Sequence, residues 1–91
     1  MSGQSLHQKL TDALTAQLTP VELELTDDSA AHAGHAGARD GAHFNLRIVS
    51  ARFEGMPRIA RHRLVYDALR PWMAGGIHAL AIDARTPDEA R

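Results

Sequence analysis

Three short segments of this 91-residue chain alternate between apolar and polar residues, and this alternation restricts the fold more than any other sequence feature. They are "VELELTD" at residues 21–27, "HFNLRIVSA" at 43–51 and "IHALAIDA" at 77–84. Strict alternation predicts β-strands that bury one face and leave the other in water. The residues expected to face the core are Val21, Leu23, Leu25, Phe44, Leu46, Ile48, Leu80 and Ile82, with His78 on the side of the last two. Helices must therefore cover one face of the sheet only.

The segment "SLHQKLTDALTAQLTP", residues 5–20, predicts the first of these helices. Leucine recurs at every fourth position from Leu6 to Leu18, and this spacing lines one face of a helix. Ser5 is a typical N-cap residue, and Pro20 is expected to end the helix.

The segment "PRIARHRLVYDALR", residues 57–70, predicts a second helix that begins with a proline in its first turn. A projection at about 100° per residue predicts one core-facing arc, which consists of Ile59, His62, Val65, Tyr66 and Leu69. Pro71 should end or kink this helix, and Gly75–Gly76 should provide a left-handed exit. A short capped turn over residues 86–91 is expected to follow the third strand.

The predicted order of elements is α-β-β-α-β, which gives a two-layer α/β (α+β) domain with a three-stranded mixed sheet and both helices on one face. A chain of 91 residues supports one hydrophobic core, so residues 1–91 are assigned to a single domain. The sequence contains no apolar run near the length of a membrane span and no signal-peptide pattern at its start. We therefore expect a cytoplasmic protein that does not enter the membrane.

A histidine-containing loop, "DSAAHAGHAGARDGA" at residues 28–42, joins the first two strands and carries His32 and His35. Antiparallel pairing of these strands sets the loop at the end of the sheet where the second strand begins, directly before His43. The second helix returns the chain along the sheet, so the third strand, which carries His78, begins at the same end. The topology therefore predicts four imidazoles at one end of the sheet, where they would suit zinc, copper or iron.

Each histidine also has an ordinary structural interpretation. His35 suits a solvated loop residue, His43 a surface residue on the wet face, and His78 a packing residue near the apolar side of its strand. His62 suits a histidine within the core face of the second helix. The chain has no cysteine, so a soft metal centre bound here must take its sulfur ligands from another molecule.

The stretch "HFNLRIVSARFEGMPRIARHRLVYDALRPWMAGGIHALAIDARTP", residues 43–87, resembles the BolA family. The resemblance is carried by "FEG", "RHRLVY" and "GIHAL", in that order, and by the "DDS..H" that opens the loop. It implies a BolA fold, similar to a class II KH domain. It also implies a structural motif that includes Phe53, Gly55, His62 and Tyr66.

The resemblance further implies a monothiol glutaredoxin as partner, with a [2Fe–2S] cluster shared between the two proteins. In such pairs glutaredoxin and glutathione each supply a thiolate, and the BolA protein supplies nitrogen. His78 matches the C-terminal ligand, and His32 matches the loop ligand, with His35 and His43 as alternatives. The isolated protein is expected to be a monomer without a cofactor. It would be an accessory protein of iron–sulfur cluster trafficking and iron regulation rather than an enzyme, since no nucleophile–base motif is present.

The alternative function implied by the resemblance is that of a DNA-binding transcriptional regulator. Arg58, Arg61 and Arg63, with the turn before them, are the candidate contacts, and residues 46–91 hold eight basic against five acidic residues. KH domains hold nucleic acid with a G-x-x-G loop between two helices. The only such string, "GHAG" at residues 34–37, lies between two predicted strands. With a net charge of −1, DNA binding would have to depend on this local arginine cluster.

Overall fold

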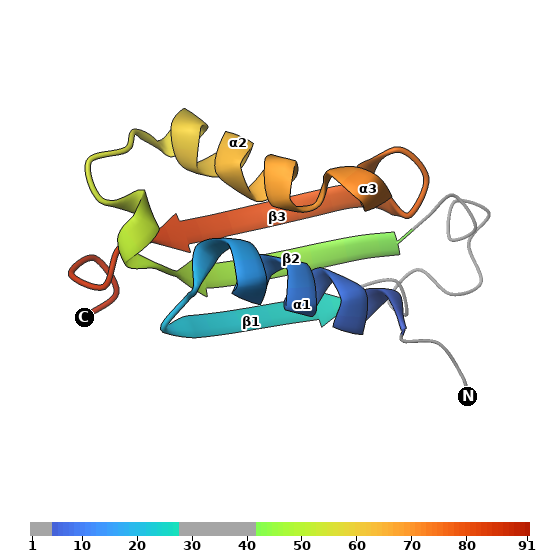
Figure 1. Cartoon of the computed structure of the whole chain (residues 1–91), viewed down its shortest axis with the longest axis horizontal. Helices are drawn as coiled ribbons and strands as arrows, with labels where there is room; N and C mark the ends of the chain where they lie inside the picture. The colour runs from blue at the N-terminus through green and yellow to red at the C-terminus, as the bar shows by residue number, and fades with distance from the viewer. Residues whose placement is uncertain (1–4, 28–41) are drawn as a thin grey trace.

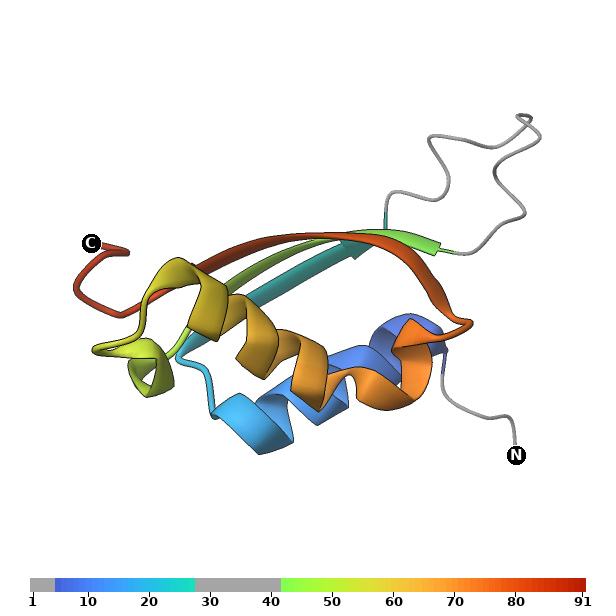
Figure 2. The ribbon, with the colours of Figure 1, turned by 90° about the horizontal axis from the view of Figure 1, so that it is seen from above.

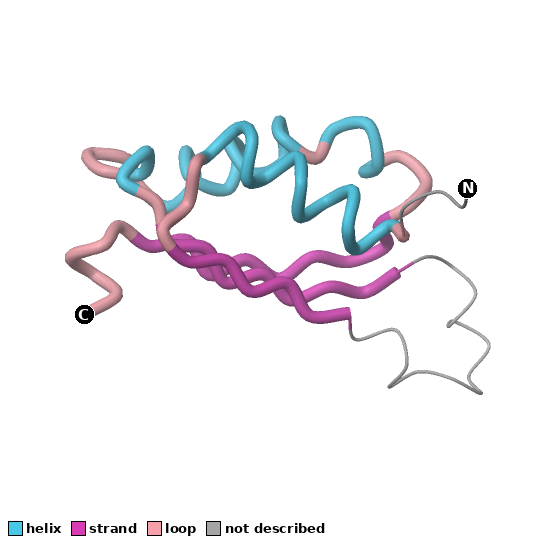
Figure 3. The backbone as a smooth tube through the Cα atoms, turned by 60° about the horizontal axis from the view of Figure 1, so that its bottom comes forward, coloured by secondary structure: helices cyan, strands magenta, loops and turns pink. Residues whose placement is uncertain are grey.

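The computed structural model describes residues 5–27 and 42–91, with Ala42 and His78 described by their backbone alone. The elements in chain order are α1 (Leu6–Leu18), β1 (Glu22–Asp27), β2 (Ala42–Val49), the 3-10 turn η3 (Ala51–Phe53), α2 (Arg58–Ala68), α3 (Arg70–Met73) and β3 (Ile77–Arg85) (Figure 1). Seen from above and from below, the helices lie together on one face of the sheet (Figures 2 and 3). The predicted two-layer α+β fold is confirmed.

The sheet has the order β1-β2-β3, with β1 antiparallel and β3 parallel to the central strand β2. The register between β2 and β3 shifts at one point, because Ala42 pairs with Ile77 but His43 pairs with Ala79. His78 is therefore an extra residue in β3, as in a β-bulge. The bulge lets both Ile77 and Leu80 contact the core, although strict alternation would send them to opposite faces.

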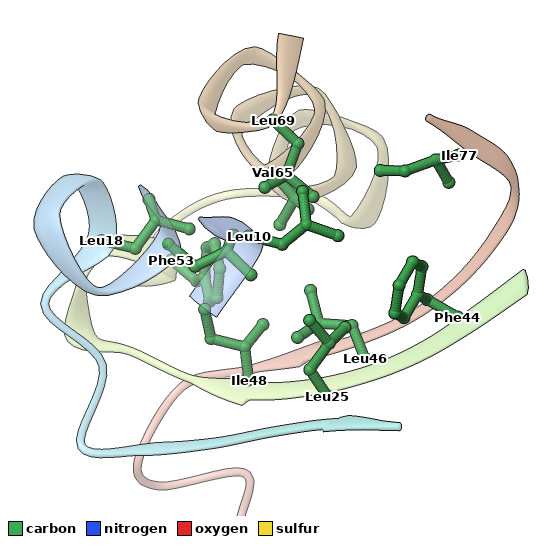
Figure 4. Packing of buried hydrophobic residues seen from close by; sticks show 11 residues of the cluster. Leu10, Leu18, Leu25, Phe44, Leu46, Ile48, Phe53, Val65, Leu69 and Ile77 are labelled. Carbon is green, nitrogen blue, oxygen red and sulfur yellow. The ribbon is translucent and has the colours of Figure 1, made fainter. Parts of the chain in front are cut away.

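The core lies between the sheet and the two long helices, where side chains from all three strands point toward α1 and α2 (Figure 4). Ser5 caps α1 as expected, since its hydroxyl accepts the backbone N–H of Gln8 at 3.1 Å. The leucine stripe is confirmed: Leu10, Leu14 and Leu18 are all buried. Sequence alternation also predicted the core side chains of β2 correctly: Phe44, Leu46 and Ile48 are buried.

The core-facing arc predicted for the second helix is only partly correct. Val65 and Leu69 are buried, but Ile59 is 64% exposed and Tyr66 is 40% exposed. The inner side of α2 is instead completed by half-buried side chains, which are Arg61, Leu64 and Ala68. The buried face is therefore displaced by about one residue step around the helix. Arg61 occupies an inner position because its polar group finds partners there, as described below.

Two further expectations are wrong. Val21 was expected in the core but is 72% exposed, because it lies in the turn between α1 and β1, ahead of the strand. Gly75–Gly76 was expected to provide a left-handed exit, yet Gly55 is the only glycine with positive φ in the described part of the chain. The predicted break near Pro71 is confirmed, since α2 ends at Ala68 and α3 begins at Arg70.

Candidate functional site

One end of the sheet brings together the end of β1 and the starts of β2 and β3. Phe44 pairs with Asp27 on one side and with Leu80 on the other, and Ala42 pairs with Ile77. The segment 28–41 therefore leaves and returns at the end of the sheet where β3 begins. The predicted direction of the chain is thus confirmed, and the backbone of His78 lies directly beside the start of β2.

The histidines assigned to this end are described to different extents. His43 is half-buried in β2, and because its neighbour Phe44 points into the core, His43 faces the surface that the helices leave uncovered. His32 and His35 lie outside the described residues, as does the side chain of His78. Their role as ligands therefore stays a prediction from the sequence.

A fifth histidine, which the sequence analysis did not assign, also lies at this end of the sheet. His7 of α1 contacts the backbone carbonyl of Leu25 with its Nε2 at 2.5 Å, so Nε2 must carry the proton that is donated. Its ring centroid is 6.4 Å from that of Phe44. No local pattern could have identified this contact, because it depends on how α1 packs across the ends of β1 and β2.

In residues 5–27 and 42–91, leaving the side chain of His78 aside, no three histidine or acidic side chains gather in a way that could hold a metal ion. His32, His35 and the side chain of His78 lie outside that part of the chain, so the ligand set assigned from the sequence stays a prediction.

The three candidate arginines of the second helix have different surroundings. Arg58 and Arg63 are exposed. The Arg61 side chain is only 13% exposed and donates from Nε to the carbonyl of Met56 at 2.9 Å and from Nη1 to that of Ala84 at 3.0 Å. Arg61 thereby joins the start of α2 to the end of β3.

Arg61 also forms a two-pronged ion pair with Glu89, with Nη1–Oε1 and Nη2–Oε2 distances of 2.6 and 3.1 Å. The predicted capped turn holds Glu89 in position. The Thr86 N–H donates to the Glu89 carboxylate at 2.9 Å, and the Glu89 N–H donates to the Thr86 hydroxyl at 3.3 Å. Hydrogen bonds from Arg61 and then from Thr86 lower the pKa of Glu89 from 4.5 to about 2.

Two of the four residues of the family motif, Phe53 and Gly55, have a role in the packing or the backbone conformation of the fold. Phe53 is fully buried in the core, and Gly55 adopts φ of 79°, a conformation that glycine reaches without strain. His62 is half-buried, and Tyr66 is on the exposed side of α2.

Comparison with known proteins identifies the family. Residues 14–89 match the model of the BolA-like protein family. This chain belongs to that family. It is 48% identical over 86 residues to the chloroplastic protein BOLA1 of Arabidopsis thaliana and 49% identical over 78 residues to BolA-like protein 1 of Mus musculus. These matches cover 90% and 86% of this chain, but 54% and 56% of the two relatives.

Solved structures of BolA proteins share the fold. The structure of BolA1 from Arabidopsis thaliana superposes with a TM-score of 0.86 at 42% identity, covering 99% of this chain and 100% of that one. Within the described ranges, no helix of the BolA-like chain has the length and apolar character needed to cross a membrane.

Proposed function

We propose that this BolA-like protein binds a monothiol glutaredoxin and shares a glutathione-ligated [2Fe–2S] cluster with it. The protein would act as an accessory factor in iron–sulfur cluster trafficking and iron regulation. Glutaredoxin and glutathione would supply thiolates, and this chain would supply one imidazole from His78 and one from the loop, with His32 ahead of His35 and His43.

The observation that carries this proposal is the meeting of three chain segments at one end of the sheet. The residues on either side of His78, Ile77 and Ala79, pair with Ala42 and His43 at the start of β2. The segment that contains His32 and His35 is attached to that same end through Asp27 and Ala42. Membership in the BolA-like family supports the same assignment.

The side chains available as ligands suit a cluster shared with another protein better than a cluster bound by this chain alone. The sequence has no cysteine, and clusters bound by one protein usually rely on thiolate ligands. When neutral imidazoles replace anionic thiolates, the bound cluster carries less negative charge and its reduction potential rises. The role of this chain would thus be to complete a coordination shell and to adjust the potential of its cargo.

Visible circular dichroism of a cluster-loaded monothiol glutaredoxin, recorded with glutathione during titration with this protein, tests the proposal. The wild-type protein should change the spectrum up to one equivalent, and His78→Ala should abolish that change. His62→Gln, on α2 and away from the start of β3, serves as the control and should behave as wild type. A His78→Ala spectrum identical to that of the wild-type mixture would overturn the assignment.

The same titration identifies the loop ligand. Single variants His32→Ala, His35→Ala and His43→Ala should include one that alters the spectrum as strongly as His78→Ala. The other two should leave it unchanged, because each iron of the shared cluster needs a fixed number of ligands.

A further inference from the structure

A hollow lies between α2 and the outer strand β3, at the opposite end of β3 from His78. Its volume is about 680 Å³. The first half of α2, the end of β3 and the C-terminal turn line it, and the lining includes Arg58, Arg61, His62, Ile82, Asp83 and Glu89. Figures 1 and 2 show α2 running beside β3 with the C-terminal turn at this end.

The backbone of β3 is available for pairing along this hollow. The strand is the last in the order β1-β2-β3, and the Arg85 carbonyl accepts the Ser50 N–H on the side of β2. Because successive residues of a strand direct their backbone groups to opposite sides, Leu80, Ile82 and Ala84 direct theirs to the outer edge. The Ala84 carbonyl is already bound by Arg61. The remaining edge groups pair with no other strand within the described residues, and such an edge can accept an added strand.

The charges of the hollow favour an anionic occupant. Arg61 is paired with Glu89 and Arg85 with Asp83, so these four groups largely neutralise one another. Arg58 is exposed and has no ion pair or hydrogen bond from its side chain among the described residues, which leaves one uncompensated cation at the mouth of the hollow.

We infer that this hollow binds an extended acidic segment of another protein, which adds a strand to the outer edge of β3. A carboxylate of that segment pairs with Arg58, and its backbone bonds to Leu80 and Ile82.

Nucleic acid is a poorer match to the same surface. Affinity for a phosphate backbone depends on several simultaneous contacts with cations. Arg58 is the only arginine of this hollow without an ion pair in the described part of the chain, and the whole chain carries a net charge of −1. An extended peptide with one or two carboxylates is a better match. Its backbone can bond to the outer edge of β3, and a carboxylate can pair with Arg58.

Fluorescence anisotropy with a labelled eight-residue peptide of alternating threonine and glutamate tests the charge requirement. Arg58→Gln should weaken binding about fivefold, the scale of one exposed charge pair. Arg63→Gln removes the same charge from an exposed position of α2 outside the hollow, and it should change affinity less than twofold. Equal weakening by both variants would overturn the proposal, since it would indicate a diffuse charge effect.

Two N-methylated forms of the peptide test the strand pairing. A strand bonds to its neighbour through every second residue only, so methyl groups on one set of alternating amides should abolish binding and those on the other set should not. Equal affinities of the two forms would refute strand addition. Tighter binding of an eight-nucleotide single-stranded DNA than of the unmodified peptide would refute the choice of ligand. His78→Ala should leave peptide affinity unchanged, so this inference and the proposed cluster function are tested separately.

Discussion

Replacement of Arg61 by glutamine tests whether this side chain holds the fold together rather than contacting a ligand. The guanidinium is largely buried and donates to the carbonyls of Met56 and Ala84. Glutamine is shorter and uncharged, so both carbonyls lose a charge-assisted donor. At about 1–1.5 kcal/mol for each partly buried bond, Arg61→Gln should lower the free energy of unfolding by about 2–3 kcal/mol. This figure covers the two carbonyl bonds alone and leaves out the partly exposed ion pair with Glu89, which a separate prediction tests below.

Urea unfolding followed by the fluorescence of Trp72 measures this loss. Trp72 is the single tryptophan of the chain and packs against the core, so its emission reports on unfolding. With a denaturant slope of about 1 kcal/mol per M, the midpoint should fall by about 2–3 M. Arg58→Gln and Arg63→Gln are the matched controls and should stay within about 0.5 kcal/mol of wild type. If the midpoint of Arg61→Gln coincides with theirs, the structural role given to Arg61 is wrong.

Three more experiments with variants test other contacts of the fold. Ser50→Ala should lower the free energy of unfolding by about 1–2 kcal/mol in the same urea experiment, because the buried Ser50 hydroxyl donates to the Leu18 carbonyl at 2.6 Å; an unchanged midpoint would contradict this. The lowered pKa of Glu89, about 2 against 4.5, means that its ion pair stabilises the fold above pH 4.5 and that this stabilisation is lost as the pH falls toward 2. Thermal midpoints of wild type and Glu89→Gln should therefore differ at pH 6 and converge at pH 2, and a constant gap would disprove the link. Gly55→Ala should cost about 1–2 kcal/mol because of its φ of 79°, whereas Gly75→Ala, with open space around the new methyl group, should cost nothing comparable.

Local periodicity was enough to predict the first half of the fold, except that Val21 was wrongly expected in the core. The leucines of α1, its cap at Ser5 and the alternating strands depend on neighbours within a few residues, and the structure confirms them. The face of α2 could not be predicted in this way. Arg61 is polar in sequence but lies inward, because its partners Ala84 and Glu89 lie 23 and 28 residues further along the chain. Ile59 is apolar but exposed, since Arg61 occupies the inner position.

In the candidate site, too, some features could be predicted from the sequence, whereas others depend on contacts between distant residues. The direction of each element was sufficient to predict that β3 begins where the segment 28–41 leaves and returns. The bulge at His78 could not be predicted, because it exists only through the pairing of β3 with β2. The contact of His7 with Leu25 depends likewise on packing between residues 18 positions apart.

The central position of β2 has a consequence for the order of events during synthesis. β1 precedes β2 in the chain, but β3 pairs with β2 only after η3, α2 and α3 have been made. Until residues 77–85 leave the ribosome, β2 carries Phe44, Leu46 and Ile48 beside an unpaired edge. Nascent chains that stall before residue 77 thus expose an apolar strand to aggregation, and they should depend more on chaperones than the finished protein does.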